Sequence, residues 1–201
     1  VEGFGSLAGI VKGKGEILDH IKPGGTAVLN FDDPHVSDWI ERVTPERFVQ
    51  FSLQEDANAE YIARDIQSNP NGRVAFTLLT PVGECEINMQ LLGRHNVMNA
   101  TAAAAVALEA GADLDNVKVG LARVAAVPGR LNAVKGDADS LLLDDSYNAS
   151  PNSFSAAIDV LATFSGRRIL ISGDMKELGN ETKSAHEFVG SHAQQAGIEA
   201  L

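Results

Sequence analysis

The sequence predicts an α/β protein, and three observations support this fold class. Between residues 26 and 91, several short runs rich in Val, Ile, Leu and Phe have the length of strands. After residue 139, apolar runs alternate with stretches of helical periodicity, which is typical of a parallel sheet with right-handed crossover helices. Pro128-Gly129 interrupts the chain between these two regions, so we place a domain boundary at residues 130–133.

The elements of the first region follow from apolar periodicity and from turn residues. Apolar side chains at helical spacing predict a first helix, which Pro23-Gly24-Gly25 ends. Pro81-Val82-Gly83 separates two strand-like runs and indicates a β-hairpin. Gly111 ends an alanine-rich helix, and Asp113 or Asp115 caps the next one. The predicted order is a helix at 6–21, a strand at 26–30, a helix at 36–42, strands at 48–53, 60–67, 73–80 and 84–91, and helices at 96–110 and 115–124.

The second region alternates strands and helices. An apolar run at residues 141–143 stops at Asp144-Asp145, and a helical pattern begins after Pro151. Ligands of open α/β sheets bind beyond the carboxyl ends of strands, so this polar segment is the first candidate site. A parallel unit this small leaves sheet faces uncovered, so we expect the natural domain to continue past residue 201. The predicted order is a strand at 140–145, a helix at 153–164, a strand at 168–172 and a helix at 183–196.

Composition and charge argue against several classes of function. The chain is 44% hydrophobic and 21% charged, as is usual for a globular protein. Its formal net charge of −11 argues against a nucleic-acid partner, although local fields still permit an anionic small ligand. No apolar run approaches the ~20 residues that span a bilayer, so we expect no membrane insertion. Cys85 is the only cysteine, which precludes an internal disulfide and fits a cytoplasmic protein.

Lys14 lies within the apolar pattern of the predicted first helix. One interpretation is a lysine that extends its ammonium group to the edge of the helix. The other is a reactive lysine, because burial favours the neutral amine and a neutral amine can form a carbamate with carbon dioxide. Lys12 is the second candidate, but it falls off the apolar face. The spacing predicts a buried stripe that contains Lys14 and consists of positions 7, 10, 11, 14, 17, 18 and 21.

Polar residues mark the start of the alanine-rich helix. An asparagine at a helix start is commonly only a cap, which is the simplest interpretation of Asn96. Asn96 and Asn99 are three residues apart, however, and can point to the same side of a helix. Each amide offers a donor and an acceptor to the edge of a purine. The two amides are therefore a candidate nucleotide contact, and His95 directly precedes them.

Arg130 and the two adjacent aspartates form the third candidate group. Arg130 is either an ordinary surface arginine or a permanently charged fork that binds phosphate through two hydrogen bonds. Asp144 and Asp145 are either ordinary carboxylates at a strand end or groups that contact a ligand. The residues alone leave these alternatives open.

Three motifs together resemble the Mur ligase family: GRHNVMNA at 93–100, Pro128-Gly129-Arg130, and LLLDDSYNASP at 141–151. The resemblance extends over the whole chain. It implies part of a P-loop-type central ATPase domain, a mixed sheet with helices, at 1–131. A partial Rossmann-like parallel α/β C-terminal domain would follow at 132–201. Neither a G-x-x-x-x-G-K-[ST] loop nor a UDP-binding domain is present in the sequence, so we expect the isolated 201 residues to be inactive.

The resemblance implies roles at the nucleotide site. Lys14 would be the carbamylated lysine that supports a magnesium and phosphate site. His95, Asn96 and Asn99 would lie at the nucleotide, as the family's Gly-x-His-Asn-x-x-Asn segment does. Arg130 would join ATP binding to closure of the last domain, with Asp145 on the ribose or phosphates.

Further roles concern the substrate side and the metal. The resemblance places Tyr147 and Asn148 near the nucleotide and the incoming substrate, and it places Asp174 and Glu177 of the GDMKELG segment on the final domain's side of the cleft. Glu2 lies near the expected magnesium ligands, although a solvated terminal carboxylate is an equal alternative.

The activity implied by the resemblance is an ATP-dependent and magnesium-dependent amide ligase. It would add D-alanyl-D-alanine to UDP-N-acetylmuramoyl-tripeptide through an acyl phosphate, as a cytoplasmic monomer. One alternative is a sister ligase of the folylpolyglutamate type, against which the SYNASP and GDMKELG segments count. The other alternative is a catalytically inactive fragment that binds a nucleotide or a partner.

Overall fold

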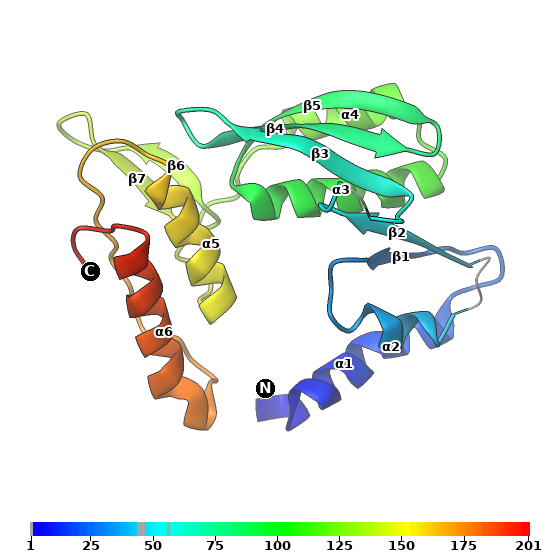
Figure 1. Cartoon of the computed structure of the whole chain (residues 1–201), viewed down its shortest axis with the longest axis horizontal. Helices are drawn as coiled ribbons and strands as arrows, with labels where there is room; N and C mark the ends of the chain where they lie inside the picture. Colours follow the sequence, from blue (N-terminus) through cyan, green and yellow to red (C-terminus); the bar gives the residue numbers. More distant parts are fainter. Residues whose placement is uncertain (1, 44–46, 56) are drawn as a thin grey trace. The chain divides into compact units, whose positions relative to one another are not determined.

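The computed structural model describes residues 2–43, 47–55 and 57–201, which form two units (Figure 1). Unit 1 comprises Val1–Gln67, Ala75–Asn88 and His95–Arg123. Unit 2 comprises Ser68–Val74, Met89–Arg94 and Val124–Leu201. These units reflect which segments pack together, and they differ from the predicted domains 1–131 and 132–201. The domain boundary between residues 131 and 132 stays a prediction.

Unit 1 contains most of the helices and strands, although one end of β3, β4, β5 and α3 falls in the segments Ser68–Val74 and Met89–Arg94 of unit 2. β1, β2, β3, β4 and β5 form one sheet in that order, with β1 parallel to β2 and β2 parallel to β3. A tight turn joins β4 to β5, as the hairpin prediction required. The elements are η1 (Glu2–Phe4), α1 (Leu7–Gly15), η2 (Glu16–His20), β1 (Ala27–Asn30), α2 (Val36–Ile40), β2 (Phe48–Ser52), β3 (Tyr61–Ser68), β4 (Arg73–Thr80), β5 (Gly83–Leu92), α3 (Arg94–Glu109) and α4 (Leu114–Arg123).

The alanine-rich helix α3 covers one face of this sheet (Figure 1). Ala105 is fully buried against Phe51 and Tyr61, so small side chains let the helix approach the strands closely. The Tyr61 hydroxyl donates to Glu109 Oε1 at 2.6 Å. Burial and the neighbouring Glu109 carboxylate raise the pKa of the Tyr61 phenol. At the start of α4, the Asp113 carboxylate accepts from Asn116 N at 2.7 Å, so Asp113 is the cap.

Unit 2 consists of a two-stranded ribbon, two packed helices and the segments Ser68–Val74 and Met89–Arg94. β6 and β7 pair antiparallel, with Asn132 opposite Asp144 and Lys135 opposite Leu141. Ile158 of the first helix is fully buried in a cluster with residues of the second. None of the helices in the described ranges is long and apolar enough to cross a membrane. The elements are β6 (Asn132–Lys135), β7 (Leu141–Asp144), α5 (Pro151–Ala162), η4 (Gly179–Glu181) and α6 (Thr182–Gln195).

The structure corrects the predicted strands of the second region. The strand predicted at 168–172 is reduced to one parallel bridge between Ile169 and Ala200, and Ile171 is 89% exposed. β7 pairs with β6, which the sequence did not predict, and not with this segment. Val134 is the only large apolar residue of β6, so its pattern is too weak to indicate a strand. The predicted α/β class is confirmed, but in unit 2 β7 pairs antiparallel with β6, and the expected parallel pairing is limited to the bridge between Ile169 and Ala200.

Candidate functional site

Two segments far apart in the sequence lie together at one end of the β6–β7 ribbon. The ribbon places residues 128–131 beside residues 144–147, because Asn132 pairs with Asp144. Tyr147 N donates to Gly129 O at 3.0 Å and closes this contact. Gly129 has a φ of +76°, and a Cβ atom there would lie 3.2 Å from Tyr147 N. The turn at 128–130 therefore requires glycine in its middle.

The aspartates at the end of β7 hold this turn by accepting backbone hydrogen bonds. Asp144 accepts from Gly129 N at 3.1 Å through Oδ2 and from Ser146 N at 3.2 Å through Oδ1. Asp145 Oδ1 accepts from Leu131 N at 3.0 Å. Hydrogen bonds from the hydroxyl and then the N–H of Ser146 lower the pKa of the Asp144 carboxyl, because they favour its charged form. Both aspartates thus have structural roles, which is the simpler of the two interpretations.

Asp145 also retains the capacity to bind a ligand. Within unit 2, which the structure describes completely, no residue forms a hydrogen bond with Asp145 Oδ2. A carboxylate with one oxygen fixed and the other free can accept a hydrogen bond from a hydroxyl group of a ligand. The predicted contact with a ribose is therefore compatible with this geometry.

Arg130 extends from the same turn and stacks on Tyr147. Its Cζ atom lies 4.1 Å from the centre of the Tyr147 ring, within the range of a cation–π contact. No carboxylate of unit 2 forms an ion pair with its guanidinium group. The N–H donors of Arg130 therefore remain available for an anion.

The remaining substrate-side candidates are Asn148, which directly follows Tyr147, and Asp174 and Glu177 of the GDMKELG segment. The Asn148 side chain accepts from Ala149 N at 2.9 Å, and Asp174 and Glu177 are exposed. Within the described unit 2, no hydrogen bond or ion pair joins these three residues to Arg130. The structure thus brings Arg130, Asp145 and Tyr147 together, whereas within unit 2 no hydrogen bond or ion pair links them to the GDMKELG segment.

His186 fixes the GDMKELG segment, a role that periodicity could not indicate. His186 Nε2 accepts from Met175 N at 3.2 Å, and Nδ1 faces Thr182 O at 2.7 Å. Because a carbonyl only accepts, these partners require a neutral ring that carries its proton on Nδ1. Met175 is 3% exposed, so the segment is anchored by one buried side chain and one imidazole.

The polar residues at the start of α3 form a separate group in unit 1. Asn96 Nδ2 lies 3.1 Å from His95 Nε2, and Asn99 Nδ2 donates to Asn96 Oδ1 at 3.3 Å. α3 begins at Arg94, so Asn96 lies inside its first turn and the interpretation of Asn96 as a cap is wrong. The side chains of His95, Asn96 and Asn99 thus contact one another in sequence, and their role at the nucleotide stays a prediction.

Lys14 is exposed on α1, so the predicted buried stripe through this residue is wrong. α1 ends at Gly15, and the chain continues as η2, a 3-10 helix with about three residues per turn in place of about 3.6. Apolar positions after Gly15 therefore turn away from the earlier face, and Ile17 is 74% exposed. Lys14 lacks the burial that favours a neutral amine, and its carbamate stays a prediction.

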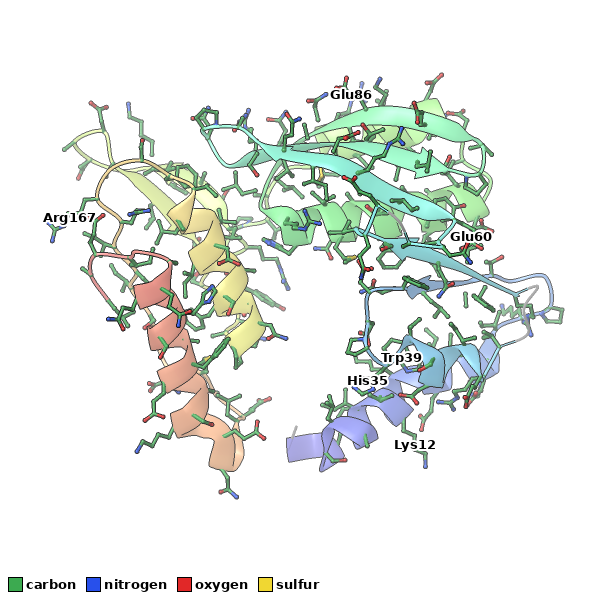
Figure 2. All side chains as sticks on the ribbon, in the orientation of Figure 1. Lys12, His35, Trp39, Glu60, Glu86 and Arg167 are labelled. Atoms are coloured by element: carbon green, nitrogen blue, oxygen red, sulfur yellow. The ribbon has the colours of Figure 1, made fainter. Side chains whose placement is uncertain are left out.

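A pocket of about 500 Å³ lies between α1 and α2. Figure 2 shows His35 and Trp39 on the α2 side of this pocket and Lys12 on α1. Trp39 Nε1 donates to Val11 O at 3.1 Å and fastens the two helices together. Lys14 does not line the pocket, so the pocket does not support a reactive lysine. The lining residues are Leu7, Ala8, Val11, Lys12, His35, Asp38, Trp39 and Arg42.

The described residues do not form a metal centre. In residues 2–43, 47–55 and 57–201, no three carboxylate, imidazole or thiol groups come together as a metal site. The side chain of Glu2, the predicted metal ligand, lies outside the described part of the chain. The described residues therefore provide no cluster of three such ligands, and a magnesium ion held by one or two carboxylates, water and phosphate stays a prediction.

Comparison with known proteins identifies related ligases. Family models match residues 1–107 as the Mur ligase middle domain and residues 129–201 as the Mur ligase glutamate ligase domain. The UDP-N-acetylmuramoyl-tripeptide–D-alanyl-D-alanine ligase of Escherichia coli is 44% identical over 201 residues, which are 100% of this chain and 44% of the relative. The ligase of the same name from Haemophilus influenzae is 41% identical over 100% of this chain and 43% of its own length.

Solved structures share the fold. MurF from Acinetobacter baumannii matches with a TM-score of 0.90 at 32% identity, over 98% of this chain and 43% of that one. MurF from Thermotoga maritima, in complex with ADP, matches with a TM-score of 0.79 at 28% identity, over 94% and 42%. The chain spans less than half the length of the curated relatives it matches. Because the middle-domain model alone covers more than half of the chain, the chain belongs to the Mur ligase family.

Proposed function

We propose that this chain is part of an ATP-dependent amide ligase of peptidoglycan synthesis. The proposed reaction adds D-alanyl-D-alanine to UDP-N-acetylmuramoyl-tripeptide, which is the reaction named for the Escherichia coli relative. The observation that carries this proposal is the 44% identity to that relative over all 201 residues. A cytoplasmic location and a monomeric state are parts of the same proposal.

The proposed chemistry proceeds through an acyl phosphate. The terminal carboxylate of the tripeptide attacks the γ-phosphorus of ATP, and ADP leaves. The amine of the dipeptide then attacks the acyl carbon, and the tetrahedral intermediate expels inorganic phosphate as the amide forms. Catalysis of this kind depends mainly on positioning and on neutralising phosphate charge.

Arg130 is the residue of this chain best suited to neutralise phosphate charge. Its N–H donors are exposed and have no carboxylate partner within unit 2. Asp145 would accept from a ribose hydroxyl through its free oxygen, and His95, Asn96 and Asn99 would contact the base. Magnesium would supply phosphate neutralisation in ATP-dependent ligation, and the described residues hold no cluster of three metal ligands.

One sequence feature favours a second function for the isolated chain. The 201 residues contain no G-x-x-x-x-G-K-[ST] loop, which cradles the triphosphate in P-loop enzymes. We therefore expect the chain by itself to bind a nucleotide weakly and to be catalytically inactive. A complete ligase would supply the missing loop.

The test uses a chimera in which residues 1–201 replace the matching segment of the Escherichia coli relative. Phosphate release is measured with UDP-N-acetylmuramoyl-tripeptide, ATP and either D-alanyl-D-alanine or single amino acids. We expect turnover only with the dipeptide. Turnover with single amino acids, or none with any substrate in a folded chimera, would contradict the proposed function.

Two arginine variants of the chimera test the phosphate site. Arg130→Ala should raise the KM for ATP by about tenfold or more, because a hydrogen bond to a charged group contributes about 1.5–3 kcal/mol. Arg167→Ala is the matched control, because Arg167 is also an exposed arginine of unit 2 and lies away from the turn in sequence (Figure 2). An equal KM for ATP in the two variants would remove Arg130 from the site.

A further inference from the structure

The contact between Arg130 and Tyr147 is formed at the surface of unit 2. Tyr147 is 68% exposed, and the Arg130 side chain is exposed as well. Packing of a hydrophobic core therefore does not force the two side chains together. The guanidinium carbon nevertheless lies 4.1 Å from the ring centre, which requires that the backbone aligns the two residues.

Three hydrogen bonds donated by backbone N–H groups produce this alignment. Tyr147 N donates to Gly129 O, directly before Arg130, at 3.0 Å. The Asp144 carboxylate accepts from Gly129 N at 3.1 Å and from Ser146 N at 3.2 Å, so one side chain joins both segments. The residue before Arg130 and the residue before Tyr147 are thus bonded to the same carboxylate.

Stacking constrains Arg130 without occupying its hydrogen-bond donors. A guanidinium group that lies over an aromatic ring uses its flat face, and its N–H bonds point outward in its own plane. An ion pair with a carboxylate would instead occupy those donors. An arginine held by its face is restricted in rotamer freedom before it meets an anion, which reduces the entropic cost of binding.

We propose that Tyr147 is a positioning residue that presents Arg130 to a nucleotide phosphate. Asp144 maintains the turn on which both side chains depend. This inference rests on the proposed function, and it gives Tyr147, which was predicted to lie near the nucleotide and the incoming substrate, a defined role toward the phosphate through Arg130. The phenol hydroxyl is not required, whereas the ring is.

The first experiment measures the stacking itself in the full 201-residue chain. Proton NMR shifts of the Arg130 side chain should show an upfield ring-current shift in the unmodified chain and in Tyr147→Phe. Tyr147→Leu should remove this shift, while the Arg167 signals remain unchanged in all three proteins. An Arg130 shift that persists in Tyr147→Leu would overturn the proposal.

The second experiment measures the KM for ATP in the chimera described above. Tyr147→Leu should raise it about two- to fivefold, as expected when an exposed cation–π contact is lost, while kcat changes less. Tyr147→Phe should retain the KM of the unmodified chimera. A normal KM in Tyr147→Leu would overturn the proposal even if the ring-current shift is lost.

A double variant separates this inference from the proposed function. If Tyr147 acts through Arg130, Tyr147→Leu should have no further effect on the KM for ATP in an Arg130→Ala background. The same two- to fivefold increase in that background would overturn the positioning role and leave the ligase function intact. An unchanged KM in Arg130→Ala alone would instead refute the phosphate role of Arg130, and the inference with it.

Discussion

Replacing Gly129 by alanine tests the turn that carries Arg130. The left-handed backbone at this position, with φ of +76°, costs an alanine about 1–2 kcal/mol relative to glycine. The new Cβ atom would lie 3.2 Å from Tyr147 N and 3.3 Å from Tyr147 Cβ, closer than nearly all Cβ contacts. Relief requires the Tyr147 segment to move away, which weakens its hydrogen bond to Gly129 O.

The magnitude follows from comparison with a second glycine of unit 2. Gly166 has a φ of +92°, and a Cβ atom there would meet nothing within 4 Å. Both alanine variants carry the left-handed cost, and both gain about 0.4–1 kcal/mol from a less flexible unfolded chain. Only Gly129→Ala also loses a backbone hydrogen bond, which contributes about 0.5–1.5 kcal/mol. We expect Gly129→Ala to be the less stable variant by about 1 kcal/mol.

Two measurements check this expectation in the 201-residue chain. Urea unfolding followed by circular dichroism gives the free energy of unfolding of each variant. Hydrogen exchange of the Tyr147 amide should be faster in Gly129→Ala and unchanged in Gly166→Ala. Equal stability of the two variants, with equal protection of the Tyr147 amide, would refute the role assigned to close contact at Gly129.

Three further predictions concern charged and polar residues. The pKa of the Asp144 carboxyl is lowered in the folded protein, so the charged carboxylate stabilises the fold above its ordinary pKa, and this stabilisation is lost as pH falls through the lower folded pKa. Asp144→Asn should therefore reduce the dependence of the free energy of unfolding on pH in acid, measured by urea unfolding at several pH values. His186→Ala should lower the free energy of unfolding by about 1–3 kcal/mol and expose the Met175 amide to exchange, because a buried donor loses its acceptor; unchanged protection of that amide would contradict the assigned anchor. In the chimera, Lys14→Ala should abolish ligation even with added bicarbonate, whereas Lys12→Ala should remain active; near-normal turnover of Lys14→Ala would remove Lys14 from the mechanism.

Elements with strong periodicity were predictable. β4 occupies Arg73–Thr80 as predicted, because every second residue from Val74 onward is buried. α5 was predicted to begin at residue 153 and begins at Pro151. The hydroxyl of Ser150 accepts from Ser153 N, and the hydroxyl of Ser153 accepts from Ser150 N, so a reciprocal cap sets the true start. β6 was not predictable, because its four residues show no apolar alternation and it is a strand through its pairing with β7.

The candidate site was predictable as a set of residues but not as a set of contacts. Periodicity and motif spacing are local, whereas the bond from Gly129 to Asp144 spans 15 residues and that from Met175 to His186 spans 11. The stripe through Lys14 failed within α1 itself, where Lys14 and Leu7 are both exposed, and after Gly15 the backbone also changes its helical repeat. Arg130 was identified by resemblance, but its aromatic neighbour became evident only in three dimensions.

The alanine face of α3 has a consequence for how the chain tolerates change. Ala100, Ala104 and Ala105 are almost completely buried, and Ala105 packs directly against Phe51 and Tyr61 of the sheet. Larger residues at these positions would push the helix away from the residues against which it packs, whereas glycine would remove only one methyl group. At these positions α3 has no long, flexible side chains that could rearrange if the helix moved. The side chains of His95, Asn96 and Asn99 at the start of α3 are therefore held by a closely packed helix, and only small residues fit at its buried alanine positions.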